Sequence, residues 1–297
     1  MLGYRIVYLI INFKRHYIIP IEAFHYTTSN RALKILLSKQ LRFGKYEFTN
    51  DPKESKEWVI FLDGLGVPPT NFSHEDKKKI YRKINEIKYK EWKVLCVSQN
   101  NPRLEKVTLT EKPYLEASQL FLSGYSKPRM WAFYASENNK HTGVCLKFNG
   151  TNLNKKVVEK FSAQYKVYSD VIEYDDERLF EFPHLQLDLS NYTTNLTQKA
   201  REHIIEYHQE YFFLKSKDWE SENEFRWVIN SKKDKLEYIS IEGILEEVML
   251  GADYPKDDSI CILKACEELR VPVGEIQWPN GTPALKHGVV YQPPISG

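Results

Sequence analysis

Apolar residues recur every three or four positions in several stretches of the chain, the spacing that places them on one side of a helix. The clearest stretch begins at Ser73, a suitable N-cap, and carries Ile80, Ile84 and Ile87 as one stripe up to about Trp92. Similar spacing predicts helices at residues 30–39, 127–136, 196–214 and 257–269.

Other stretches alternate apolar and polar residues, as Val144, Leu146 and Phe148 do, which is typical of strands. Strands are predicted at residues 1–12, 21–28, 41–44, 94–97, 143–148, 165–174, 225–229, 237–241, 247–250 and 275–278. Strands and helices mix without the regular alternation of βαβ units, and no Pro/Gly/Ser-rich linker divides them. The pattern predicts one α+β domain over residues 1–297, with a mixed or antiparallel sheet core and helical insertions.

The composition of the chain argues against two classes of binding partner, nucleic acid and anionic membranes. The chain has 42 Lys+Arg and 40 Asp+Glu residues, so its formal charge of +2 creates no field that would attract nucleic acid or an anionic membrane. Lys77, Lys78 and Lys79 form a basic run without interleaved aromatic residues, which favours a solvated helix face and gives no strong nucleic-acid signal.

Four cysteines in 297 residues are too few for a disulfide framework, and they suit the reducing cytoplasm, which is the expected location. The apolar run at residues 1–12 is shorter than the roughly 20 residues of a membrane-spanning helix, so no membrane partner is expected.

Several chemistries find no support in the sequence. No glycine-rich nucleotide motif or Gly-x-Ser-x-Gly elbow occurs, and Cys96 and Cys145 lie in apolar strands that disfavour a thiolate. No spacing indicates a metal site. A metal site assembled across loops from His25, Asp51, Glu54 and His141 stays open, and a metal-dependent hydrolase that uses the first three of these residues is an alternative.

The most polar segment covers residues 215–227. Glu220, Glu222, Glu224 and Arg226 occur at every second position, so in an extended strand all four would point to one side while Phe225 and Trp227 face the core. This arrangement predicts a site of carboxylates and a guanidinium. The alternative is an amphipathic strand whose charges are ordinary surface ions.

Two further segments carry candidate residues. His25 and Thr27 lie at the end of a strand just before a helix, where a side chain can face a cleft, although a single strand histidine more often has a structural role. Trp131 and Tyr134 share one helical face, which suggests core packing, and Tyr134 could also stack on a planar ligand.

Together these segments resemble the ordered motifs of a bacterial family, domain-of-unknown-function family 2971, over about residues 24–269. The motifs are Asn50-Asp51-Pro52-Lys53-Glu54, Val97-Ser98, Met130-Trp131-Ala132-Phe133-Tyr134-Ala135, His141-Thr142-Gly143-Val144-Cys145, Lys215 with Trp219-Glu220-Ser221-Glu222-Asn223-Glu224-Phe225-Arg226, and Val248-Met249-Leu250-Gly251. The family name implies no reaction. Asp51, Glu54, Trp131 and His141 become further site candidates on this resemblance.

The outline also resembles the His-Tyr-Glu branch of the ADP-ribosyltransferase superfamily, which implies a split sheet and NAD as co-substrate. On this resemblance His25 would hold the adenosine-side ribose, and Tyr134 would stack on nicotinamide. Glu224 would bind the 2′-hydroxyl of the nicotinamide ribose, and Glu222 would be the additional acid of a Glu-x-Glu motif.

The chemistry of the residues agrees with that reaction. Cleavage of a ribosyl–nicotinamide bond passes through an oxocarbenium-like state, which a carboxylate such as Glu224 stabilises, while Arg226 could orient that carboxylate or bind the pyrophosphate. We therefore expect an ADP-ribosyltransferase or NAD glycohydrolase, used as a toxin or anti-phage effector, with an unknown protein or nucleic-acid target. A nucleic-acid-binding or other non-catalytic module is the alternative.

Overall fold

The structure is a computed structural model, and it describes residues 19–58, 73–102, 104, 120–135, 141–181, 195–231 and 235–288. The strand predicted at residues 1–12 lies outside this part of the chain. Within the described residues, no helix has both the length and the apolar character needed to cross a bilayer.

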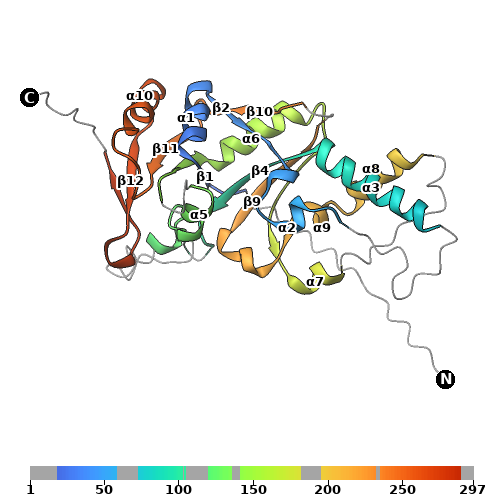
Figure 1. Cartoon of the computed structure of the whole chain (residues 1–297). Helices are drawn as coiled ribbons and strands as arrows, with labels where there is room; N and C mark the ends of the chain where they lie inside the picture. The colour runs from blue at the N-terminus through green and yellow to red at the C-terminus, as the bar shows by residue number, and fades with distance from the viewer. Residues whose placement is uncertain are drawn as a thin grey trace, which may run out of the picture.

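A mixed sheet forms the centre of the molecule (Figure 1). Its strands follow the order β13-β12-β11-β5-β1-β4-β9-β6, and β3 also pairs with β4. Their bounds are β1 Glu22–Thr27, β3 Gly44–Lys45, β4 Trp92–Gln99, β5 Val144–Asn149, β6 Val167–Val171, β9 Glu224–Asn230, β11 Leu245–Leu250, β12 Val273–Gln277 and β13 Ala284–His287. Only β11 and β12 pair in parallel in this sheet; the other pairs described are antiparallel.

The described residues also form two smaller sheets. One pairs β2 (Gln40–Arg42) with β10 (Tyr238–Ser240), and the other pairs β7 (Glu173–Tyr174) with β8 (Leu214–Lys215). The second pair ends at Lys215, whose Nζ donates to Glu224 at the start of β9.

Helices cover both faces of the main sheet. On one face, α1 (Ser29–Ser38), α6 (Gly150–Phe161) and α10 (Ser259–Leu269) bury an aliphatic and aromatic cluster with Leu95, Val97, Phe225 and Trp227 of the sheet. In Figure 1 these helices lie above the sheet, and α2, α5, α7 and α9 lie below it. The bounds of these four helices are α2 Pro52–Ser55, α5 Pro128–Phe133, α7 Asp176–Glu181 and α9 His208–Phe212.

The second face of the sheet holds two separate apolar clusters. One contains Val94 and Val228 and extends to α3 (His74–Glu91) and α8 (Leu196–Glu206). The other contains Phe24 of β1 and Trp131 of α5. Between the two clusters, the register pairs Cys96 with Arg226 and Ser98 with Glu224. Charged residues therefore lie on this face between two hydrophobic regions.

The predicted α+β class, with a mixed sheet and helical insertions, is confirmed. The helix predicted after Ser73 is also confirmed, and the Ser73 side chain accepts a hydrogen bond from the Asp76 backbone. The single helix predicted at residues 196–214 is wrong, because Tyr207 leaves helical geometry and separates α8 from α9. This break lets Tyr211 and Phe212 pack on the same cluster as Ile204.

Candidate functional site

The polar segment is built differently from the extended strand that the sequence predicts. Residues Lys217–Glu222 form a 3-10 helix, Asn223 is left-handed with φ 45, and β9 begins only at Glu224. The Asn223 side chain holds this turn by donating to the carbonyl oxygens of Gln99 and Asn100 at 3.0 and 2.9 Å. Glu220 is exposed, while Glu222 is buried.

Lys215 and Arg226 connect the carboxylates of this segment. The Lys215 Nζ donates to Glu222 Oε2 at 2.7 Å and to Glu224 Oε2 at 3.0 Å. Arg226 donates two hydrogen bonds to Glu224, from Nε to Oε1 at 2.5 Å and from Nη2 to Oε2 at 2.9 Å. Its Nη1 also forms an ion pair with Glu54 Oε1 and donates to the Phe212 carbonyl at 2.9 Å. We call these five residues the buried ion network.

The buried ion network is almost completely removed from solvent. Glu222 and Glu224 are 4% and 5% exposed, and Arg226 is 1% exposed. The alternative of solvated surface ions is therefore wrong for these residues. Buried charges need paired partners because water no longer stabilises them, and each acid of the network has at least one cationic partner within the chain.

Glu222 and Glu224 respond to this environment in opposite ways. Burial by itself would raise the pKa of Glu224, but the charges of Arg226 and Lys215 outweigh it and hold that pKa well below its usual range. Burial and the neighbouring Glu224 charge raise the pKa of Glu222. Glu224 is thus the ionised carboxylate, and Glu222 is the carboxyl that can carry a proton nearer to neutral pH.

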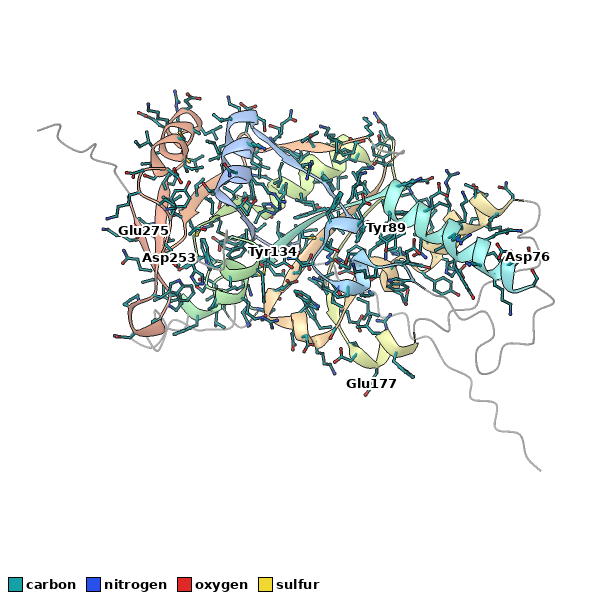
Figure 2. All side chains as sticks on the ribbon, in the orientation of Figure 1. Asp76, Tyr89, Tyr134, Glu177, Asp253 and Glu275 are labelled. Carbon is teal, nitrogen blue, oxygen red and sulfur yellow. The ribbon has the colours of Figure 1, made fainter. Side chains whose placement is uncertain are left out.

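Three aromatic residues contact the buried ion network, two of them from other elements and one from the 3-10 helix that carries Glu222. Tyr134, at the C-cap of α5, donates its hydroxyl to Glu222 Oε1 at 2.7 Å. The Tyr174 hydroxyl accepts the Glu224 backbone N–H at 3.0 Å, and the Trp219 ring centroid lies 5.1 Å from Lys215 Nζ. Tyr134 is labelled near the centre of the view in Figure 2, far from Asp76 at the start of α3. Tyr134 is half-buried, so its ring borders the network on a partly accessible side.

Helix α2 supplies Glu54 to the network and places its N-cap residue, Asp51, nearby. Asp51 caps this helix through Oδ1, which accepts the Lys53 N–H at 2.9 Å. Its other oxygen, Oδ2, is buried and has no hydrogen-bond partner among the described residues. The Ser98 Oγ and the Tyr46 hydroxyl, both close to the network, are also buried without a partner in this part of the chain. Polar groups thus remain unsatisfied around the charges.

His25 and Thr27 are not brought to the same side. Phe24 pairs with Ser98, and Ser98 pairs with Glu224, so the Phe24 side chain shares the face of the network. Because side chains alternate along β1, His25 and Thr27 face α1 on the opposite side of the sheet. The His25 Nδ1 lies 3.1 Å from the Cys96 carbonyl oxygen, and burial lowers the pKa of His25.

The remaining candidates are separate from the network. Trp131 is fully buried, and its Nε1 donates to the Tyr125 carbonyl at 2.8 Å, so it belongs to the core. His141 lies beside Trp278, with ring centroids 5.9 Å apart. The structure therefore does not assemble the four predicted metal ligands, and within its described residues no group of three or more His, Cys, Asp or Glu could hold a metal ion.

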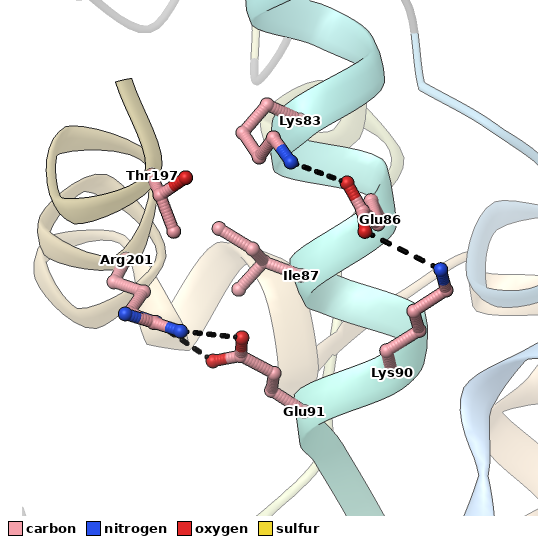
Figure 3. A pocket seen from close by; sticks show the side chains of 7 residues that line it. All are labelled: Lys83, Glu86, Ile87, Lys90, Glu91, Thr197 and Arg201. Atoms are coloured by element: carbon pink, nitrogen blue, oxygen red, sulfur yellow. Dashed lines mark hydrogen bonds and ion pairs between the residues drawn. The ribbon is translucent and has the colours of Figure 1, made fainter. Parts of the chain in front are cut away.

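Two surface hollows lie along α3 and do not include the buried ion network. The smaller, with a volume of about 90 Å³, lies between α3 and α8, where Arg201 holds Glu91 and Glu86 binds Lys83 and Lys90 (Figure 3). The larger is lined by Lys45, Glu47, Glu57, Arg82, Glu86, Tyr89 and Lys90. Both mix acids with bases, which does not favour the nucleic-acid-binding alternative on this helix.

Sequence reasoning missed the roles of Lys215 and Tyr174. Lys215 entered only as part of a motif, although a lysine directly after the apolar run Phe212 to Leu214 is a signal of a buried cation that needs acidic partners. Tyr174 carried no signal, because its contact with Glu224 joins residues 50 positions apart.

Residues 130–227 match the model of a family described as Protein of unknown function (DUF2971). This finding supports the predicted resemblance for about a third of the chain, and the matched part contains Tyr134, Lys215, Glu222, Glu224 and Arg226. No curated protein and no solved structure matches the chain.

Proposed function

We propose that this protein cleaves the bond between nicotinamide and ribose in NAD, as an ADP-ribosyltransferase or an NAD glycohydrolase. The observation that carries the proposal is the Glu224 carboxylate, which Arg226 and Lys215 hold ionised and fixed in direction. As the glycosidic bond breaks, positive charge develops on the ribose, and a fixed carboxylate stabilises that charge without reorganising.

Glu222 and Tyr134 supply the other functions that the reaction needs. The half-buried Tyr134 ring offers a surface on which a nicotinamide ring can stack, and its hydroxyl is tied to Glu222. Glu222 shares Lys215 with Glu224, so a ribose hydroxyl that binds Glu224 comes within reach of both acids. The geometry supports no direct role for His25 in this step.

The cellular use is proposed on the resemblance to ADP-ribosyltransferases alone. An enzyme that consumes NAD, or that modifies a target with ADP-ribose, is suited to a toxin or an anti-phage defence effector.

The test compares nicotinamide release from NAD by the wild-type protein, Glu224→Gln and the control Glu91→Gln. Glu91 is also a buried acid held by an arginine, Arg201, but it lies between α3 and α8. We expect release by the wild type and by Glu91→Gln, and a loss of about 100-fold or more in Glu224→Gln. Circular dichroism checks that each variant is folded.

Absence of nicotinamide release from the wild-type protein contradicts the proposal. A folded Glu224→Gln variant that is as active as the wild type contradicts the role of Glu224.

A further inference from the structure

The Asp51 carboxylate has one oxygen that the fold does not use. Asp51 Oδ1 caps α2 by accepting the Lys53 N–H, whereas Oδ2 is buried and has no hydrogen-bond partner among the described residues. The residue is only 4% exposed. A buried carboxylate oxygen without a partner is costly, so a group that donates a hydrogen bond to it is expected at this place.

The surroundings of Asp51 connect it to the buried ion network. The charges of Lys215 and Glu54, both members of the network, act directly on Asp51. On the side of α3, the Lys88 ammonium is buried and makes a long bond of 3.4 Å to the Lys53 carbonyl, and the Trp58 ring centroid is 5.0 Å away. Asp51 and Lys88 interact electrostatically, so an acceptor and a donor lie near each other in a polar interior.

We propose that the group bound by Asp51 Oδ2 is the attacking water, and that the protein is therefore an NAD glycohydrolase with Asp51 as its general base. This inference rests on the proposed function. Asp51 lies on the buried side of the network, whereas Tyr134 borders its partly accessible side, so a small acceptor suits Oδ2 better than a side chain or base of a macromolecular target. Water is thus the acceptor that suits the position of the free oxygen.

The step balances without an oxidant or reductant. The water oxygen bonds to the ribose carbon C1′ as the bond from C1′ to the nicotinamide nitrogen breaks. The bonding pair leaves with that nitrogen, giving neutral nicotinamide. The proton of the water passes to Asp51 Oδ2 and then to solvent, while Glu224 stabilises the charge on the ribose. The products are ADP-ribose, nicotinamide and a proton.

The decrease of the hydrolysis rate at acidic pH is expected to report the protonation of Asp51. Burial and the Glu54 charge raise the pKa of Asp51, and the Lys53 N–H, Lys215 and the Lys53 charge oppose that rise; Lys88 of α3 also interacts with it. A base works only when ionised, so the rate falls as pH drops through this raised pKa. Glu222 titrates in the same direction, and a variant of Asp51 separates the two groups.

The first experiment follows the products of NAD cleavage by the wild-type full chain, in the presence of bacterial protein and nucleic acid. We expect free ADP-ribose equal in amount to the nicotinamide released. If most of the ADP-ribose is instead bound to macromolecules, water is not the acceptor and the inference is overturned, while the proposed function stands. If no nicotinamide appears, the proposed function fails and this inference fails with it.

The second experiment measures kcat and KM for Asp51→Asn, with Asp175→Asn as the matched control. Asp175 Oδ1 also accepts backbone N–H groups at the start of a helix, α7, and asparagine caps helices as well as aspartate does. We expect Asp51→Asn to fold, to keep its KM, and to lose about 100-fold or more in kcat. The decrease in rate at acidic pH that comes from protonation of Asp51 should also disappear in this variant. Asp175→Asn keeps the wild-type rate.

Formate tests the same role without depending on the asparagine variant. In Asp51→Ala, added formate should restore part of the lost hydrolysis, because a small carboxylate can occupy the space of the missing base. Wild-type kcat in Asp51→Asn, or a loss in Asp51→Ala that formate does not restore, overturns the assignment of Asp51 as the base.

Discussion

Glu222 and Glu224 stand two residues apart, yet the pKa of one is raised and that of the other is lowered. The difference comes from their partners, because Glu224 contacts both Arg226 and Lys215, whereas Glu222 contacts only Lys215 and the Tyr134 hydroxyl among the cations and donors described. At the scale of residues, ionisation therefore depends on which side chains surround a group and not on its position along the chain.

His203 gives a second residue-scale consequence, which concerns stability. It is 4% exposed, its Nε2 has no hydrogen-bond partner among the described residues, and burial lowers its pKa from 6.5 to about 4. The unfolded chain binds a proton near pH 6.5 while the folded protein does not, so stability falls as pH drops from 6.5 toward 4.

We predict that His203→Phe removes this part of the acid sensitivity. The His203 ring packs against Tyr207, with centroids 4.8 Å apart, so an aromatic replacement keeps the packing. Relative to its value at pH 7, the free energy of unfolding at pH 4.5 should fall by roughly 2 to 3 kcal/mol less in the variant than in the wild type. Urea unfolding at both pH values measures the difference, and equal losses in the two proteins would contradict the prediction.

At the scale of elements, local signals determine where helices begin. Helix α3 begins after Ser73, whose hydroxyl accepts the Asp76 N–H at 3.2 Å, whereas Thr28, the N-cap residue of α1, makes no side-chain cap hydrogen bond. In the polar segment, a short turn ends a helix instead of starting one. The left-handed Asn223 ends the 3-10 helix and sets the direction in which β9 leaves it.

We predict that Ser73→Ala lowers the free energy of unfolding by about 1 kcal/mol, because it removes the hydrogen bond that caps α3. Thr28→Ala is the matched control, since the Thr28 side chain does not cap α1. Urea unfolding of both variants gives the comparison. A Thr28→Ala loss as large as that of Ser73→Ala would mean that the cap is not the cause.

At the scale of the whole molecule, the order of the strands creates the site. β9 lies between β4 and β6, and α2, α5 and β8 approach the same face from distant parts of the chain. Close contacts between segments hold this arrangement. At the end of β11, the Gly251 N–H donates to the Gly143 carbonyl at 2.9 Å, and the His141 carbonyl lies directly beside the Gly251 Cα.

We predict that Gly251→Ala destabilises the fold by about 1 to 3 kcal/mol, because its Cβ would overlap the His141 carbonyl and force the backbone apart. Gly44→Ala is the control: its Cβ would lie 3.7 Å from the Val94 carbonyl oxygen, an ordinary contact. Denaturant midpoints of the two variants should differ clearly. Equal midpoints would show that the strand ends adjust without cost.

Much of the element pattern could be predicted from the sequence, because helices and strands depend on nearby residues. Ile80, Ile84 and Ile87 lie on the buried side of α3 as their spacing predicts, and Val144, Leu146 and Phe148 share one face of β5. Helix α6 was missed even though Leu153, Val157 and Phe161 lie four residues apart and are buried. Their spacing of four is the pattern of a helix with one buried side.

The candidate site could be predicted only in part. The sequence by itself determined that Glu222, Glu224 and Arg226 are close in space, because they are close in the chain. Only the tertiary structure decided that they are buried, that Glu54 and Tyr134 join them, and that His25 faces the other side of the sheet. The physical reason is that pairing of buried charges depends on strand order and register, which bring together residues as far apart as the 88 positions between Tyr134 and Glu222.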